Sequence, residues 1–393
     1  MRVLLLHNRY QFVGGEESVM QAEKALLEAK GHQVTLIEIS NDEIVGIWGK
    51  ANAAASAVYS IASKQRVSAE IADFRPDIVH VHNFFPLLSP SVYDACSDAR
   101  VPVVQTLHNY RLGCPNAILL RDGKVCEDCL GKRIPWPGIV HACYRGSRTQ
   151  SAVVAAMLAF HQLRGTWQKR VDAYIVLTAF QKEKMVQAGL PREKVYIKPN
   201  YVFAPEKLVD RSLDVSYALF VGRLSQEKGV ATLIDAYLQN NLRIPLKIVG
   251  DGPLREVLQA RVEATGLENA IQSLGWQDKS AVLSLMCSAN FLVFPSTWYE
   301  GFPVTILEAF ACGLPVLASR LGSMAEMVED GVTGLHFEAG NSADLANKLQ
   351  WAYEHPKEMI CMGKNARRIY EAHYTPEANY QQLMAIYHTL HMK

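Results

Sequence analysis

The stretch FPSTWYEGFPVTILEAFACGLPVLAS occupies residues 294–319 and contains a strand end, a glycine-broken loop, one helix and the next strand. Pro303 stands where the first residue of a helix tolerates a missing N–H. Gly313 stands where a helix ends, and Pro315 where it cannot continue. This local chemistry bounds the helix at both ends and predicts an α/β domain.

The start of this helix predicts an anion-binding site, because its backbone N–H groups are free and its dipole favours negative charge. The residues that open it are Gly301, Phe302, Pro303 and Val304. Glu308, near the second turn, can accept hydrogen bonds from neutral hydroxyls such as those of a ribose. A diphosphate and a ribose together make a sugar nucleotide. An ordinary capped helix between two buried strands is the alternative.

The pattern E-G-F-P followed by E-A-x-A-x-G-x-P-V, with seven residues between Glu300 and Glu308, resembles the donor-binding signature of retaining family 4 glycosyltransferases of the GT-B fold. The resemblance extends from the Gly14-Gly15 loop to the last helix and is strongest over residues 217–340. It implies an α/β fold of two Rossmann-like, doubly wound domains facing each other across a cleft. It also implies that Glu300 holds the hydroxyls of the transferred sugar.

A basic loop with glycines at both ends, G-R-L-S-Q-E-K-G, follows the expected strand at residues 217–221. Its Arg223 and Lys228 can close on a diphosphate from two sides. The resemblance implies the same role for this loop, which starts at Gly222, and a place near the nucleotide for the next turn, which contains Gly250, Asp251 and Gly252. It implies that Trp276 and Gln277 contact the base, and core packing is the alternative for Trp276.

The first half begins with a short buried strand, a loop through Gly14 and Gly15, a helix over residues 17–30 and a strand over residues 33–39. This is a βαβ unit without the G-x-G-x-x-G fingerprint, which argues against a nicotinamide or flavin cofactor. In the family that the chain resembles, the paired glycines let the backbone approach the donor diphosphate or the acceptor. A plain turn is the alternative.

His108 follows the strand expected over residues 102–107. Ligands of open parallel sheets bind at this carboxyl edge. The resemblance, through the TLH motif, implies that His108 contacts the transferred sugar or the acceptor, and it need not be a general base.

Cys114, Cys126, Cys129 and Cys143 give the spacing C-x11-C-x2-C-x13-C in a segment rich in Gly, Pro and charged residues. Four thiolates can hold a structural zinc ion in a closed tetrahedral site. Four reduced, uncoordinated cysteines are the alternative, and an iron–sulfur cluster uses the same ligands.

Composition narrows the classes of partner. Lys plus Arg number 40 and Asp plus Glu 39, so no global field recruits nucleic acid. The apolar run at residues 3–6 is too short for a secretory signal, and no run reaches the ~20 apolar residues of a membrane span. We therefore expect a cytoplasmic protein. Basic and aromatic residues are interleaved over residues 132–170. This pattern suits a surface that faces anionic lipid at the inner face of the membrane. An ordinary core helix with a basic face is the alternative.

We expect an N-terminal acceptor-side domain over residues 1–205, a nucleotide-sugar-binding domain over residues 206–375, and a last helix over residues 376–393 that packs on the first domain. The expected activity is transfer of a hexose, with retention, from a UDP- or GDP-sugar to a glycan or lipid-linked acceptor in surface polysaccharide or glycolipid synthesis. No cofactor is expected for catalysis. A sugar-nucleotide epimerase of the same fold and a non-catalytic sugar-nucleotide-binding protein are the alternatives.

Overall fold

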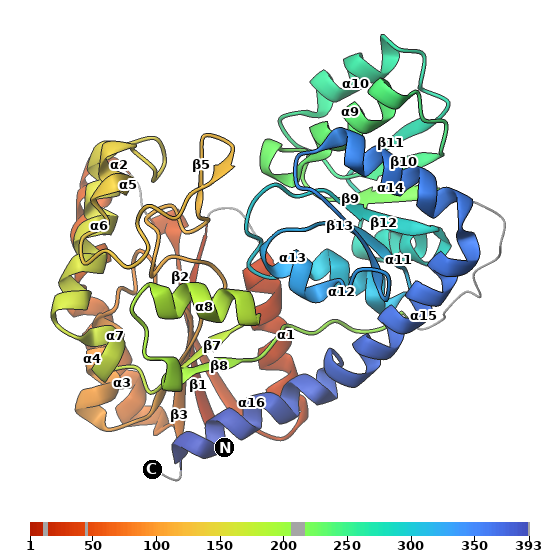
Figure 1. The fold of residues 1–393 in the computed structure, drawn as a ribbon. Helices are drawn as coiled ribbons and strands as arrows, with labels where there is room; N and C mark the ends of the chain where they lie inside the picture. Colours follow the sequence, from red (N-terminus) through yellow and green to blue (C-terminus); the bar gives the residue numbers. More distant parts are fainter. Residues whose placement is uncertain (11–14, 44–45, 206–216, 392–393) are drawn as a thin grey trace. The chain divides into compact units, whose positions relative to one another are not determined.

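The structure is a computed structural model that describes residues 1–10, 15–43, 46–205 and 217–391. These residues form two compact units (Figure 1). The first unit comprises Met1–Leu119, Cys126–Asn200 and Asn379–Lys393, and the second comprises Leu120–Val125 and Tyr201–Ala378. The chain thus passes from the first unit to the second after Asn200, before the expected boundary at residue 205, and returns at Asn379.

The first unit is built on a six-stranded sheet with the order β2-β1-β3-β4-β7-β8, in which every neighbouring pair is parallel. Strand order reverses between β1 and β3, which in open α/β sheets marks the ligand-binding edge. The strands are β1 (Arg2–Arg9), β2 (Gln33–Ser40), β3 (Ile78–Asn83), β4 (Val103–Thr106), β7 (Ala173–Val176) and β8 (Val195–Ile197).

Helices flank this sheet, and two of them, α1 and α16, share one face of it (Figure 1). On that face Met20 and Leu27 of α1 and Leu383 of α16 pack against Leu5 of β1 and Ile78 of β3. The helices are α1 (Gly15–Ala29), α2 (Gly46–Val58), α3 (Ile61–Phe74), α4 (Ser91–Ala99), α5 (Trp136–Val140), α6 (Arg148–Leu163), α7 (Thr166–Lys169), α8 (Ala179–Gln187) and α16 (Pro376–His391), with short 3-10 turns η1 (Asn41–Glu43) and η2 (Arg192–Lys194).

The second unit repeats the plan with the strand order β11-β10-β9-β12-β13-β14, again all parallel. The order reverses between β9 and β12, so the loops that follow these two strands meet at the ligand-binding edge. The strands are β9 (Ala218–Val221), β10 (Leu246–Val249), β11 (Ile271–Gly275), β12 (Phe291–Phe294), β13 (Val316–Ser319) and β14 (Gly334–Phe337). A separate two-stranded antiparallel hairpin of β5 (Leu120–Arg121) and β6 (Lys124–Val125) groups with this unit.

Two hydrophobic cores lie on opposite faces of the second sheet. Alternate residues of β9 divide between them, Phe220 belonging to one core and Leu219 to the other, as the two-residue period of a strand requires. Helices α9, α10 and α14 contribute to the first core and α11, α12 and α13 to the second. The helical segments are η3 (Gln226–Lys228), α9 (Val230–Asn240), α10 (Arg255–Glu263), α11 (Lys279–Ser288), α12 (Val304–Ala311), α13 (Gly322–Met327), α14 (Ser342–Glu354) and α15 (Pro356–His373).

The helix of the opening stretch is α12, and its start differs by one residue from the sequence expectation. Pro303 is the N-cap residue, with an extended backbone, and the helix begins at Val304. At the other end Gly313 has a φ of 62°, the left-handed conformation that ends helices and that only glycine adopts without cost. No helix among the described residues combines the length and the apolar character that crossing a bilayer demands.

Candidate functional site

Lys228 and Glu300 meet at the point where strand order reverses in the second unit. Lys228 ends η3, on the loop that follows β9, and Glu300 lies on the loop between β12 and α12. Lys228 Nζ donates to Glu300 Oε1 over 2.7 Å. The same oxygen accepts from Ser296 Oγ at 2.6 Å and from Trp298 Nε1 at 2.9 Å. Glu300 is 6% exposed, and three donors hold its carboxylate at the ligand-binding edge.

Glycine is required where these two loops touch. Gly229 has a φ of 68°, and a Cβ there would lie 1.8 Å from the carbonyl oxygen of Pro295. The backbone of Thr297 also donates to the carbonyl of Glu227 over 2.9 Å. Any side chain at Gly229 would push the two loops apart. The glycine after Lys228 therefore sets the distance between Lys228 and Glu300.

Two of the predicted substrate-binding glycines have a packing role. A Cβ at Gly250 would lie 1.9 Å from the carbonyl oxygen of Gly222, and one at Gly252 would lie 2.5 Å from that of Leu224. The turn after β10 is thus packed on the loop that carries Arg223. Arg223 itself is exposed, which leaves its guanidinium accessible to an anion.

The α12 start offers the expected anion-binding groups. Pro303 makes no side-chain cap, so the first-turn N–H groups at Val304 and Thr305 are not used by a capping side chain. Gly301 and Phe302 are partly exposed just before it. Glu308 lies one turn further along α12, and burial raises the pKa of its carboxyl, although Lys279 Nζ at 3.9 Å opposes the shift.

Of the predicted base-contact residues, Trp276 is 73% exposed. This excludes the packing alternative, because a core indole would be buried. Gln277 donates from Nε2 to the carbonyl of Leu274 over 2.9 Å, which orients its side chain. Asp251 accepts from the backbone of Gly252 and pairs with Arg255 at 3.2 Å, so its carboxylate stabilises the turn after β10.

In the first unit, His108 follows β4 as expected and lies beside a group that sequence reasoning missed. His108, Asn109, Arg111 and Tyr10 line a cavity of about 20 Å³, which is room for about one water molecule. Glu16, on the first turn of α1, hydrogen-bonds Asn109. Gly15 opens α1, and Gly14 lies outside the described residues.

Glu16 is the most perturbed acid of this group. Burial raises the pKa of its carboxyl to about 8, although Arg111 and Asn109 favour the charged form. Its Oε1 is buried without a hydrogen-bond donor among the residues that the structure describes. A carboxyl whose pKa is raised by burial beside an Arg is typical of functional sites. The signal in the sequence is its position directly after the two glycines.

Behind His108 lies a buried polar cluster on the face of the sheet that α1 and α16 cover. His80 and His82 are in β3, Glu23 is in α1, and Lys198 follows β8. Among the described residues, Glu23, His80 and His82 form the one group of His, Cys and carboxylate side chains whose ligand atoms come within 4.8 Å of one another. Lys198 Nζ lies 2.8 Å from Glu23 Oε2 and already supplies a positive charge. A metal ion beside this ammonium would be repelled, so we do not assign a metal site here.

The four cysteines of the predicted zinc site lie near one another. Burial raises the pKa of the Cys129 thiol to about 12, and the nearby thiols of Cys114, Cys143 and Cys126 add to the effect. No three of the four sulfur atoms, all in described residues, come within 4.8 Å of one another. Around a zinc ion with bonds of about 2.3 Å, the thiolates would lie closer together than these sulfur atoms do. The zinc site stays a prediction.

Two family models match the chain in succession. The model described as Glycosyltransferase Family 4 matches residues 13–202, and the one described as Glycosyl transferases group 1 matches residues 209–369. Together they cover the loops described above and every strand of the two sheets except β1.

Among known proteins, the chain is 35% identical over 154 residues to an uncharacterised glycosyltransferase of Methanocaldococcus jannaschii, covering 39% of this chain and 43% of the relative. It is 31% identical over 199 residues to the D-rhamnosyltransferase WbpZ of Pseudomonas aeruginosa, covering 50% of each. The chain thus spans half or less of the length of these two relatives.

Among solved structures, the fold is similar to that of HepE from Anabaena in complex with UDP, with a TM-score of 0.69 at 20% identity over 99% of this chain and all of the other. HepE has also been solved with UDP-glucose, and that structure gives the same TM-score and identity over 98% of this chain and 99% of the other. At this identity the likeness establishes the GT-B fold.

Proposed function

Because the chain belongs to the family 4 glycosyltransferases of the GT-B fold, we propose that it transfers a hexose from a nucleoside diphosphate sugar to an acceptor hydroxyl with retention of configuration. The observation that carries the proposal is the contact between Lys228 and Glu300 beside the start of α12. A cation, a carboxylate and free N–H groups at one sheet edge suit the diphosphate and the sugar of such a donor.

Different residues of the second unit bind different parts of the donor. Arg223, Lys228 and the first turn of α12 stabilise the charge that grows on the leaving diphosphate as the anomeric C–O bond breaks. Glu300 accepts from the hydroxyls of the sugar and orients the ring. Glu308 accepts from the ribose, and Trp276 and Gln277 contact the base. The solved complexes of HepE with UDP and UDP-glucose support this class of donor.

In the first unit, His108 contacts the acceptor, and the surrounding group of Glu16, Asn109 and Arg111 completes the acceptor side. We propose that the acceptor attacks the same face of the sugar that the diphosphate leaves. The leaving phosphate oxygen then takes the proton of the acceptor hydroxyl. This route gives retention without a protein nucleophile, and the electrostatic work is done by the cations and the helix N-terminus of the second unit.

Donor binding is tested by thermal unfolding in the presence of UDP-, GDP- and ADP-sugars, because a ligand that binds only the folded chain raises the melting temperature. We expect the sugars of one nucleoside diphosphate to raise the melting temperature selectively. The same donor should support transfer to a glycan or lipid-linked acceptor. An α-configured donor should give an α-linked product. A changed sugar nucleotide without acceptor would indicate an epimerase. Binding without any turnover would indicate a sensor, and a β-linked product would contradict retention.

We also propose that the protein works in the cytoplasm at the inner face of the membrane, on an acceptor for surface polysaccharide or glycolipid. The support lies around α5 and α6 of the first unit. Ile134, Trp136 and Leu163 are 54, 55 and 76% exposed. Lys132 and Arg133 are exposed beside them in the sequence, with the Lys132 ammonium 5.9 Å from the centre of the Trp136 ring. Exposed apolar and basic groups together suit an anionic lipid surface.

A further inference from the structure

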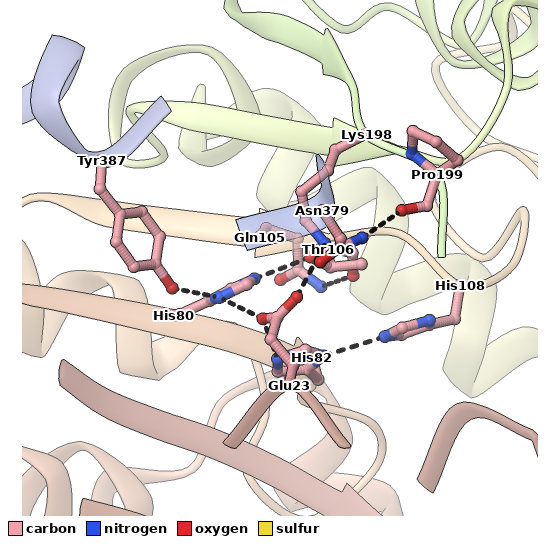
Figure 2. Close-up of polar contacts among 10 residues, drawn as sticks. All are labelled: Glu23, His80, His82, Gln105, Thr106, His108, Lys198, Pro199, Asn379 and Tyr387. Atoms are coloured by element: carbon pink, nitrogen blue, oxygen red, sulfur yellow. Dashed lines mark hydrogen bonds and ion pairs between the residues drawn. The ribbon is translucent and has the colours of Figure 1, made fainter. Parts of the chain in front are cut away.

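Figure 2 shows a continuous series of polar contacts that runs from Lys198 through Glu23 and His82 to His108, all within the first unit. Lys198 Nζ lies 2.8 Å from Glu23 Oε2. Glu23 Oε1 lies 3.2 Å from His82 Nε2. His82 Nδ1 lies 3.0 Å from His108 Nε2. The series ends at His108, which the proposed function places at the acceptor.

The charged end of this series is fixed. The side chains of Glu23 and Lys198 are each 3% exposed. Lys198 also donates to Asn379 Oδ1 at 3.1 Å, and Asn379 Nδ2 donates to the carbonyl of Pro199 at 2.6 Å. Burial alone would raise the pKa of Glu23, but the Lys198 ammonium and the two histidines hold it well below its usual range. Glu23 is therefore a permanent anion in a fixed position.

A permanent anion decides where the protons of the two rings lie. His82 Nε2 lies at ion-pair distance from the Glu23 carboxylate, whose oxygens accept and cannot donate, so the anion favours a ring proton on Nε2. In the neutral ring of His82, Nδ1 then has a lone pair and accepts. His108 Nε2, which faces it, must be the donor. The neutral His108 ring is left with a lone pair on Nδ1, its remaining nitrogen.

His108 stays neutral in this arrangement. Burial and the adjacent His82 lower the pKa of His108 well below its usual value. A neutral ring with its lone pair on Nδ1 can accept a hydrogen bond from a hydroxyl and cannot donate one from that atom. In this form the ring accepts from a sugar or acceptor hydroxyl that donates to it.

We infer that Glu23 and His82 are positioning residues that fix the tautomer and the orientation of His108, with Lys198 keeping Glu23 charged and in place. The inference rests on the proposed role of His108 in transfer. Without the anion, His82 can carry its proton on Nδ1 instead. His108 Nε2 would then accept, its proton would move to Nδ1, and the atom offered to a hydroxyl would change from acceptor to donor.

The test combines a paired substitution with a direct readout of the tautomer. Glu23→Gln alone would leave the Lys198 ammonium buried without its partner and risk unfolding, so the variant is Glu23→Gln with Lys198→Met, which removes both charges. Tyr387→Phe is the matched control. It removes the hydroxyl that contacts His80 Nδ1 at 2.7 Å in the same cluster and leaves the His82–His108 contact intact.

Nitrogen-15 NMR of the full chain labelled at histidine reports the tautomer of each ring, and a His108→Gln spectrum assigns the His108 signals. We expect wild type and Tyr387→Phe to show a protonated Nε2 and a bare Nδ1 at His108. In the double variant we expect His108 no longer to be found only as the tautomer with its proton on Nε2. An identical His108 spectrum in the double variant, or a proton on Nδ1 in wild type, would overturn the inference.

Kinetics gives the functional readout. Neutralising a carboxylate that sets the tautomer of a catalytic histidine costs about 10⁴-fold in kcat where that histidine is a general base. His108 is assigned a hydrogen-bonding role here, so we expect a kcat about 10- to 100-fold lower in the double variant. We expect KM for the donor and the melting-temperature shift with donor to be unchanged. An unchanged kcat would overturn the functional part. A wild type without transfer activity would instead overturn the proposed function, and the NMR result would still stand.

Discussion

Lys228 and Glu300 hold each other at the edge of the second sheet, where Lys228 Nζ lies 2.7 Å from Glu300 Oε1. Lys228 also lies 5.5 Å from the centre of the Trp298 ring, whose indole N–H donates to the same oxygen. The two residues proposed to hold the diphosphate and the sugar are therefore positioned by one shared set of contacts. Changing either residue alters the environment of the other.

We expect Lys228→Met to lower kcat/KM for transfer by about 10²- to 10³-fold, because removing one preorganised charge contact commonly costs ~2.7 to 4 kcal/mol of transition-state stabilisation. Glu300→Gln should have an effect of similar size, since the amide cannot hold the ammonium as a carboxylate does. Steady-state transfer rates measure both effects. Lys364→Met, at an exposed position of α15, is the control and should keep wild-type rates. Wild-type turnover in Lys228→Met would contradict the assigned role.

Gly229→Ala should both destabilise the second unit and impair transfer, because its Cβ would lie 1.8 Å from the carbonyl oxygen of Pro295. The matched control is Gly266→Ala. Gly266 has a similar φ of 66° with nothing within 4 Å of the added Cβ, so it carries only the left-handed strain of about 1 kcal/mol. Thermal unfolding of the two variants compares the costs. Equal melting temperatures would show that the loop contact does not constrain this position.

Stability should fall between about pH 4.5 and pH 8 in a way that depends on Glu16. The pKa of Glu16 is raised to about 8 in the folded chain from an ordinary value of 4.5. The folded state keeps a proton that the unfolded state loses above pH 4.5, so this stabilising contribution falls as the pH rises from about 4.5 and is lost by about pH 8. Glu16→Gln cannot lose a proton, so its melting temperature, relative to that of wild type, should be higher at pH 8 than at pH 5.

The matched control for this titration is Glu17→Gln, which removes a neighbouring charge at the start of α1. Thermal scans of the three proteins at each pH separate the two sites. The same pH dependence in wild type and Glu16→Gln would show that Glu16 is not the titrating group.

The four-cysteine segment should contain about one zinc ion per chain, held by Cys114, Cys126, Cys129 and Cys143. Elemental analysis of purified protein measures it, and titration of free thiols should find these four unreactive. Cys126→Ser with Cys129→Ser should remove the metal and lower the melting temperature. Less than about a tenth of an equivalent of any metal, with reactive thiols, would contradict the prediction.

Binding to vesicles should depend on the exposed residues near α5. We expect wild type to co-sediment with vesicles of anionic lipid and release at high salt, because charge and apolar contact act together. Ile134→Ser with Trp136→Ser should lose most of this binding. Val257→Ser, at a position 57% exposed in the second unit, is the control. No binding of wild type would remove the membrane proposal.

The part of the site around Lys228 and Glu300 could be predicted from the sequence because its signals are local. Gly313 ends a helix and Gly229 tolerates a left-handed backbone within a few residues of the groups they position. The resemblance to a known family then gave each residue an expected role. The close approach of Gly229 to Pro295 could not be predicted from the sequence, because the two residues belong to loops that follow separate strands.

By itself, the sequence determined the two doubly wound sheets and the residues at their carboxyl ends, because capping, turn chemistry and hydrophobic period act over short distances. Only the tertiary structure revealed Glu23, His82 and Lys198 behind His108. The spacing of Glu23 from Met20 and Leu27 places it on the core-facing side of α1, but this spacing does not indicate which residue is its partner. Its partner Lys198 lies 175 residues further along the chain. Buried charges need partners, and packing of α1 and α16 on the sheet decides which side chains provide them.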